Sequence, residues 1–202
     1  MTTNTTTAQV RTFVAIELPE SVIAVLAAMQ KQLTEGKLPL RLTAPAGMHL
    51  TLAFIGEIPQ TRVDDLVEAV QRGCAGIAPF GLRAEGIGMF PNANAPRVVW
   101  AGVQGMPAAM AALTNLRARI VRELAVTAFA VDRRFDPHLT LGRVPDRATS
   151  DDRARVGAAV QAQPPLGPFA FPVSEVSVMR SELRAGGSVY TRIADVALRA
   201  GG

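Results

Sequence analysis

The chain has 202 residues, 49% of them hydrophobic, and a formal net charge of +4. This composition supplies enough apolar side chains for a packed core, and the single cysteine, Cys74, excludes an internal disulfide and is typical of a reducing compartment. The charge is too small to indicate a long nucleic-acid groove, and no apolar run approaches the roughly 20 residues that cross a bilayer. We therefore expect a soluble, cytoplasmic and monomeric protein.

Residues 1–9 are polar and rich in threonine, and they lack the basic start and the apolar stretch of a signal peptide. We expect a disordered tail there, followed by a single bilobal domain over residues 10–202. The β-leaning run at 11–18 predicts a strand. A helix is predicted from Pro19 to about Thr34, where Gly36 would stop it.

The histidine at position 49 opens a run, 49–55, that is rich in Leu, Thr and Phe and is bounded by Gly56, which favours a strand. A short strand at 40–43 and a turn at 45–47 precede it. Further strands are predicted at 82–89, 97–103, 127–131, 135–144, 169–179 and 189–198. Further helices are predicted at 59–77, 106–124 and 151–160.

Helices alternate with strands that form hairpin-like pairs, and this order favours an α+β fold over a doubly wound parallel sheet. Each half of the chain offers a helix, a histidine strand, a helix and two strands. We interpret this coarse duplication as two pseudo-symmetric lobes. Each lobe would be an antiparallel-rich sheet with outer helices, and the two would enclose a central groove that carries the two His-x-Thr strands.

The only two histidines of the chain, His49 and His138, each open the same tetrapeptide, His-Leu-Thr-Leu. Alternate residues of a strand face the same way, so each copy presents an imidazole and a hydroxyl (Thr51 and Thr140) on one face and two leucines on the other. One lone His-x-Thr is more often structural, but two copies that hold every histidine reverse those odds. Two imidazoles can supply an acid and a base near neutral pH.

A phosphate fits between two such strands, because threonine hydroxyls donate to its oxygens while the imidazoles move protons. This geometry predicts in-line phosphodiester cleavage without a metal. Arg143, at the end of the second histidine strand, either clamps the phosphate or forms a surface ion pair. Identical motifs leave open which histidine is the acid.

Other chemistries have weaker support. A metal hydrolase would need Asp132, Asp136 or Cys74 beside the histidines, and the chain has no His-Glu-x-x-His or Cys-x-x-Cys spacing. A serine elbow is absent, Cys74 falls on a predicted helix as a buried thiol, and no dinucleotide or Walker-type loop occurs. We therefore expect neither a metal nor a cofactor.

The motifs and their flanks resemble the 2H phosphoesterases, and within them the LigT-like RNA 2′,3′-cyclic phosphodiesterases, also called the 2′-5′ RNA ligase family. The resemblance covers roughly residues 11–198. It includes the opening strand at 11–19, the first motif at 49–57, a mid-chain hairpin at 88–100 and the second motif at 135–143.

The resemblance implies that His49 is the proton donor, that His138 is the proton acceptor, and that Thr51, Thr140 and Arg143 contact the phosphate. It also implies hydrolysis of RNA 2′,3′-cyclic phosphate ends to 2′-phosphates, with joining of RNA ends through 2′-5′ linkages in some members. RNA with cyclic phosphate ends, or a small cyclic nucleotide, would be the partner.

One departure concerns the segment 41–43, Arg-Leu-Thr, which stands where family members often carry an aromatic residue. Phe54, Phe135 or Tyr190 could stack on a base instead, although we expect a place in the core for each more than a stacking role. Two alternatives stay open: a non-catalytic module that binds RNA ends or nucleotides, and a 2H phosphodiesterase that acts on a small cyclic nucleotide, an ADP-ribose cyclic phosphate or another phosphodiester.

Overall fold

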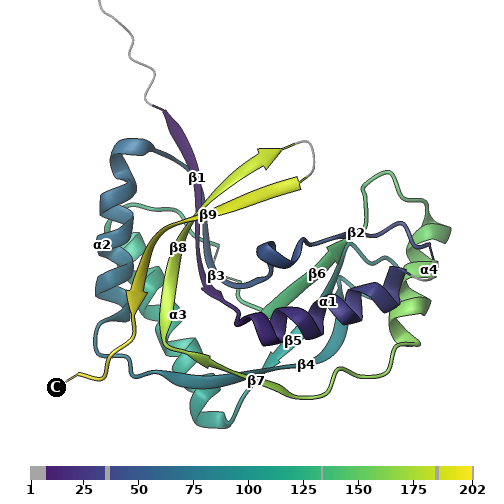
Figure 1. Cartoon of the computed structure of the whole chain (residues 1–202). Helices are drawn as coiled ribbons and strands as arrows, with labels where there is room; N and C mark the ends of the chain where they lie inside the picture. The colour runs from purple at the N-terminus through teal and green to yellow at the C-terminus, as the bar shows by residue number, and fades with distance from the viewer. Residues whose placement is uncertain (1–7, 35–36, 133, 185–186, 202) are drawn as a thin grey trace, which may run out of the picture.

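The computed structural model describes residues 8–34, 37–132, 134–184 and 187–201, and over these it has the predicted α+β architecture (Figure 1). The strands are β1 (Gln9–Glu17), β2 (Arg41–Leu42), β3 (His49–Pro59), β4 (Phe80–Phe90), β5 (Val98–Gln104), β6 (His138–Arg143), β7 (Phe169–Val173), β8 (Glu175–Arg184) and β9 (Gly187–Ala197). The helices are α1 (Glu20–Thr34), α2 (Val63–Cys74), α3 (Pro107–Val126) and α4 (Ser150–Gln161), with short 3₁₀ turns at Pro45–Gly47 and Gln60–Arg62. None of these described helices has the length and apolar character needed to span a bilayer.

The sheet is antiparallel throughout its described pairings and runs in the order β7-β4-β5-β6-β3-β1-β8-β9, with β2 added beside β6. The two histidine strands, β3 and β6, are neighbours at its centre. They meet at one residue pair, Leu50 with Leu139, so the sheet curls into two halves there. The predicted pair of lobes is confirmed, and the structure adds that the two lobes share one hydrogen-bonded sheet.

The helices cover the outside of the curled sheet (Figure 1). α2 packs on α3 beside β8 and β9, and α3 also contacts β3, while α1 contacts β6 and β7 and α4 contacts β4. Helix α1, although it follows β1, therefore lies over the other lobe. Each motif leucine is almost completely buried on the helix side: Leu50, Leu52, Leu139 and Leu141. The leucines thus hold the two histidine strands from behind, as predicted.

The predicted strand at 127–131 is wrong. Helix α3 continues to Val126, and the hydroxyl of Thr127 donates to the carbonyl oxygens of Glu123 and Leu124, both at 3.0 Å. Ala128 then takes a left-handed conformation (φ 60°), and Phe129 is buried in the core. The apolar character of this run therefore comes from a helix end that buries one phenylalanine, and no strand forms.

Other element boundaries shift. The predicted strand at 169–179 is two strands, because the chain passes at Ser174 from β7, beside β4, to β8, beside β1. The second histidine strand is shorter than predicted and begins at His138, directly after Pro137. Residues 1–7 of the expected tail and the helix stop at Gly36 lie outside the described residues, whereas Gln9 already belongs to β1 and pairs with Pro59.

A buried glutamine on α1 fixes the end of the second histidine strand. The side-chain amide of Gln30, which is 4% exposed, donates to the carbonyl oxygens of Leu141 at 2.6 Å and Thr43 at 2.8 Å. The backbone N–H of Thr43 also donates to the Leu141 carbonyl at 2.9 Å. Gln30 therefore ties together α1, β6 and the segment after β2 by hydrogen bonds shielded from water.

Replacing Gln30 by methionine, which has a similar volume and cannot donate, should destabilise the protein by about 1–3 kcal/mol, because the structure loses a buried hydrogen bond to Leu141 and the partly buried Thr43 carbonyl loses its partner. Gln32→Met, on the exposed face of the same helix, is the matched control and should change little. Urea unfolding of both variants measures the difference. Equal stabilities of the two variants would contradict this role of Gln30.

Candidate active site

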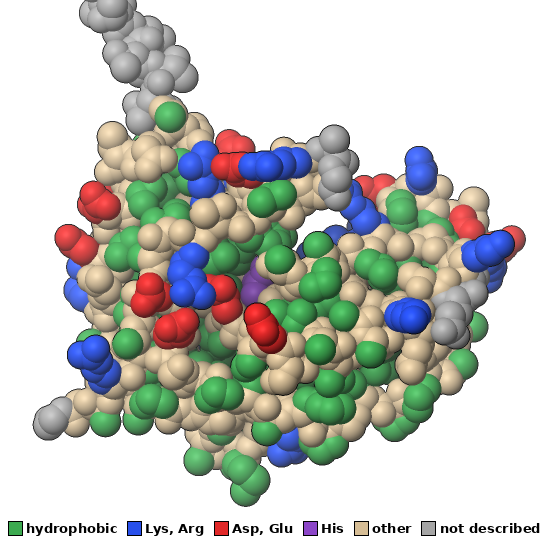
Figure 2. Space-filling model, viewed as in Figure 1, with side chains coloured by type: hydrophobic (Ala, Val, Ile, Leu, Met, Phe, Trp, Pro, Cys, Tyr) green, Lys and Arg blue, Asp and Glu red, His purple; other side chains and the backbone are tan. Residues whose placement is uncertain are grey.

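The antiparallel register at the centre of the sheet brings the two motifs face to face. With Leu50 opposite Leu139, the pairing places His49 opposite Thr140 and Thr51 opposite His138. The four polar side chains share the face away from the buried leucines. His49, Thr51, Thr140 and Arg143 line a cavity of about 380 Å³, and Figure 2 shows a histidine (purple) within the hollow between the two lobes.

Each motif contains a register shift at its second leucine. In β3 the partners of Val14 and Ala15 are Ala53 and Thr51, so Leu52 is extra. In β6 the partners of Val99 and Trp100 are Gly142 and Thr140, so Leu141 is extra. Such a bulge changes the face taken by the residues that follow it.

The residues that follow the two bulges consequently reach the cavity. Arg143 lines it, although strict alternation from His138 would place Arg143 on the opposite face. Its counterpart in the first motif is Phe54, which also lines the cavity and is 45% exposed. The two copies therefore offer a cation on one side and an aromatic ring on the other.

Both imidazoles are held by backbone two residues earlier in the chain. Nδ1 of His138 lies 2.7 Å from the carbonyl oxygen of Asp136, and the ring of His49 hydrogen-bonds to the backbone of Gly47. In the neutral tautomer that donates from Nδ1, Nε2 of His138 is unprotonated and can accept a proton. The repeated motif thus comes with a repeated anchor.

Aromatic rings pack against the two imidazoles unequally. His49 stacks on Phe13, with ring centroids 4.7 Å apart, and meets Tyr190 edge-on at 5.2 Å. His138 makes an edge contact with Phe90 at 5.1 Å. The surroundings of the two histidines therefore differ, even though the local backbone is repeated.

Burial lowers the pKa of His49 to about 4, from an ordinary value of 6.5. The bond to Gly47 and the charge of Glu17 raise this pKa, while the charges of His138 and Arg143 lower it further. Glu17 pairs with His49 across β1 and β3, and its carboxylate accepts a hydrogen bond from Nε of Arg192 at 2.7 Å. His49 is consequently neutral at pH 7 in the free protein.

The cavity is positively charged and carries hydroxyls. Arg11 and Arg143 line it, together with Thr43, Ser181 and Ser188, and no described Asp or Glu does. Nε of Arg11 is buried without a hydrogen-bond partner, and its guanidinium lies 4.9 Å from the ring centroid of Phe54. A site with this lining is suited to an anion that carries an aromatic group.

The structure brings together four of the five predicted site residues in the cavity lining. The fifth, His138, is outside that lining but close enough for its charge to affect the pKa of His49. Among the stacking candidates, Phe54 and Tyr190 line the cavity, whereas Phe135 packs against the core under the guanidinium of Arg117.

Sequence reasoning missed Arg11 and Phe13. Both lie on the predicted first strand, and their alternation with Val14 and Ile16, which are buried in the main core, marks them as facing the other side. That alternation could have identified them as groove residues. Tyr190 is among the expected stacking residues, but its packing on His49 depends on the β8–β9 hairpin folding over the groove, and no local sequence pattern indicates it.

The described part of the chain contains no assembled site for a metal hydrolase or for a cysteine nucleophile. No group of three or more His, Cys, Asp and Glu residues is placed there to hold a metal ion. Cys74 is buried on α2, as predicted, and burial raises the pKa of its thiol to about 12.

Comparison with known proteins identifies relatives along almost the whole chain. A family model described as the 2′-5′ RNA ligase superfamily matches residues 18–185. An RNA 2′,3′-cyclic phosphodiesterase of Methanothermobacter thermautotrophicus is 31% identical, over 91% of this chain and 96% of that protein. The crystal structure of TT0787 from Thermus thermophilus is 31% identical with a TM-score of 0.74, covering 94% of this chain and 98% of that one. E. coli LigT complexed with 3′-AMP is 25% identical with a TM-score of 0.71, covering 95% and 99%.

A proton NMR titration should show His49 titrating with a midpoint near pH 4, because its burial disfavours the imidazolium. Glu17→Gln should lower the midpoint further, since it removes a charge that favours protonation. Inorganic phosphate should raise it, because an anion beside the ring stabilises the imidazolium. A His49→Asn variant assigns the resonance, and a midpoint near 6.5 without phosphate would contradict the expectation.

Proposed function

Because the chain belongs to the 2′-5′ RNA ligase superfamily, we propose that it is an RNA 2′,3′-cyclic phosphodiesterase, which opens cyclic phosphate ends to 2′-phosphates. One observation carries the proposal: the two motif strands pair at Leu50 and Leu139, so that His49, Thr51 and Thr140 line one groove with arginine, and His138 lies close enough for its charge to affect the pKa of His49. The curated relative from Methanothermobacter, named for this activity, supports it over nearly its full length.

The cyclic phosphate occupies the space between the two histidine strands. The hydroxyls of Thr51 and Thr140 donate to its two non-bridging oxygens, and Arg143 balances their charge. This arrangement favours the transition state, because negative charge builds on those oxygens when a fifth oxygen approaches phosphorus. Strands packed on a leucine layer hold the donors in place without further reorganisation.

The histidines move the protons of the hydrolysis. The oxygen of a water molecule attacks phosphorus while Nε2 of His138 takes one of its protons. The bond from phosphorus to the ribose 3′-oxygen breaks, and that oxygen receives a proton from His49. The product carries a 2′-phosphate and a 3′-hydroxyl, and exchange with solvent returns the histidines to their starting states.

The donor role of His49 requires a proton that the free protein does not hold at pH 7, since burial lowers the pKa of this ring to about 4. The bound phosphate resolves this conflict, because a negative charge in contact with the ring raises its pKa. The proton then enters with the substrate or from solvent as the complex forms. His49 is thus neutral in the free protein and becomes an acid only in the complex.

Phe54 provides the surface for the base. It is the most exposed aromatic side chain of the cavity lining, and Arg11 supports its ring from one side. Stacking of a base on an aromatic ring does not depend on base identity, so a terminal nucleotide of any sequence is accommodated. The complex of E. coli LigT with 3′-AMP supports a nucleotide as the class of ligand.

The proposal extends to the organisation of the protein. The described residues from Gln9 onward form one bilobal catalytic domain, and the protein acts as a cytoplasmic monomer on RNA ends. The buried, unreactive thiol of Cys74 suits a reducing compartment.

His49→Ala and His138→Ala should each remove nearly all turnover of 2′,3′-cyclic AMP, because each deletes a group that moves a proton and such groups contribute roughly 10²–10⁴-fold. Turnover by the wild type should survive EDTA. Thermal unfolding of each variant is the control for folding. The assignment is wrong if either folded variant retains full activity, and activity that EDTA abolishes and zinc restores would instead support a metal hydrolase.

Thr51→Val and Thr140→Val should each lower kcat/KM by about 10- to 100-fold, since each removes one hydrogen bond to a charged phosphate, worth roughly 1.5–3 kcal/mol. Valine keeps the shape and the strand preference of threonine, so the fold is retained. Thr114→Val, on the exposed surface of α3, is the control. Unchanged kinetics in both motif variants would make these threonines ordinary strand residues.

A further inference from the structure

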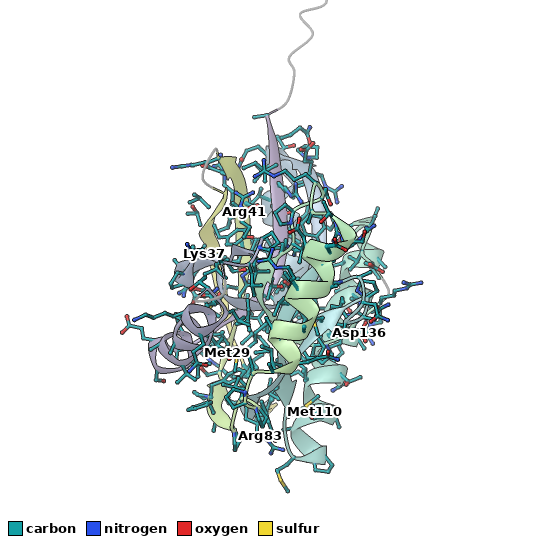
Figure 3. The ribbon with its side chains drawn as sticks, turned by 90° about the vertical axis from the view of Figure 1, so that its right-hand side faces the viewer. Met29, Lys37, Arg41, Arg83, Met110 and Asp136 are labelled. Carbon is teal, nitrogen blue, oxygen red and sulfur yellow. The ribbon has the colours of Figure 1, made fainter. Side chains whose placement is uncertain are left out.

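The groove continues beyond the cavity that holds the motifs. A second cavity, of about 240 Å³, shares Thr43, Gly47, Arg143, Ser188 and Tyr190 with the first. It extends between β2 and the β8–β9 hairpin, where its wall adds Arg41 and Arg184. In Figure 2 basic side chains (blue) lie along this hairpin above the hollow with acidic ones (red) between them, and Figure 3 places Arg41 beside the hairpin ribbon.

Two arginines stand directly opposite each other at the junction of the two cavities. Arg41 of β2 pairs in register with Arg143 of β6, and like charges in this relation destabilise a sheet. Within the described residues neither arginine forms an ion pair, and no Asp or Glu lines the second cavity. Arg184 is different, since it is already paired with Glu182 at 2.8 Å. An anion between Arg41 and Arg143 would remove their repulsion.

The hairpin leaves room for the Arg41 side chain. Gly187 has a φ of +131°, a conformation that L side chains rarely adopt, and a Cβ atom there would lie 3.0 Å from Nη2 of Arg41. The guanidinium therefore rests against hairpin backbone, across the groove from its own strand. This places a cation in the second cavity, which adjoins the cavity that holds the motifs.

We infer that the second cavity binds the phosphodiester preceding the terminal nucleotide of an RNA strand, with Arg41 as its main contact. The inference rests on the proposed function and names the substrate class of that site. A cyclic mononucleotide brings one anion, which the motifs and Arg143 receive, whereas an RNA end brings a second anion one nucleotide away. The protein is therefore selective for RNA ends over free cyclic nucleotides.

The test compares two substrates, the dinucleotide ApA with a 2′,3′-cyclic phosphate end and 2′,3′-cyclic AMP. The wild type should favour the dinucleotide in kcat/KM, and Arg41→Ala should reduce that preference by about tenfold, mainly through KM. Loss of one phosphate contact should also flatten the salt dependence of the dinucleotide KM by about 0.7 in the log–log slope. Arg41→Lys should restore part of the preference, and Arg155→Ala, on the exposed surface of α4, should leave it unchanged.

The inference is overturned if Arg41→Ala leaves the preference intact, or if it lowers the kinetics of both substrates equally. A binding measurement tests the inference independently of turnover. ApA ending in a 2′-phosphate should have a lower Kd than 2′-AMP, and Arg41→Ala should reduce the difference between the two Kd values. Failure of the wild type to turn over either substrate would refute the proposed function alone, while equal binding of the two ligands would refute the second phosphate site.

Discussion

The contact on which the site depends is the single pair between Leu50 and Leu139, where the two lobes of the sheet join. A slip of this pairing by one residue would turn the histidine of one strand toward the helices and expose the leucines of that strand to the groove. The leucines prevent such a slip, because all four motif leucines are at most 2% exposed and pack in the main core. Burial of apolar surface on one face thus determines the placement of the polar groups on the other.

The two motif strands share their backbone geometry, but the side chains around them differ, and these differences allow the two motifs to take different roles. Both motifs have the same anchor to backbone two residues earlier and the same bulge at the second leucine. The residues that follow the two bulges into the groove differ, since one is Phe54 and the other is Arg143. One side of the groove can therefore stack on a base, and the other side carries a positive charge. The aromatic rings around His49 enclose it more than Phe90 encloses His138. Two identical tetrapeptides can therefore take opposite proton-transfer roles.

Sequence reasoning identified the parts of the site that follow from local periodicity. The two-residue period of a strand predicts which face carries His49, Thr51, His138 and Thr140. The coarse duplication of the sequence predicts the two lobes. The bulges could not be predicted, since a bulge is defined by the register of the partner strands β1 and β5 rather than by its own residues. Arg143 therefore lines the groove although strict alternation places it on the other face. The prediction of a strand at 127–131 was wrong for a related reason. A short apolar segment has the same sequence pattern whether it pairs in a sheet or covers the end of a helix.

Net charge is a poor guide to the electrostatics of this groove. The overall balance of +4 does not by itself indicate a nucleic-acid site, yet the cavities are lined by arginine and by no described carboxylate. Two carboxylates near the groove are paired with cations, Glu17 with Arg192, and Glu182 with Arg180 and Arg184. These pairs lie on the lobe formed by β1, β8 and β9, and among the described residues Arg11, Arg41 and Arg143 line the two cavities without forming an ion pair. The positions of the ion pairs, more than the net charge of the chain, therefore give the groove the positive charge that attracts phosphate.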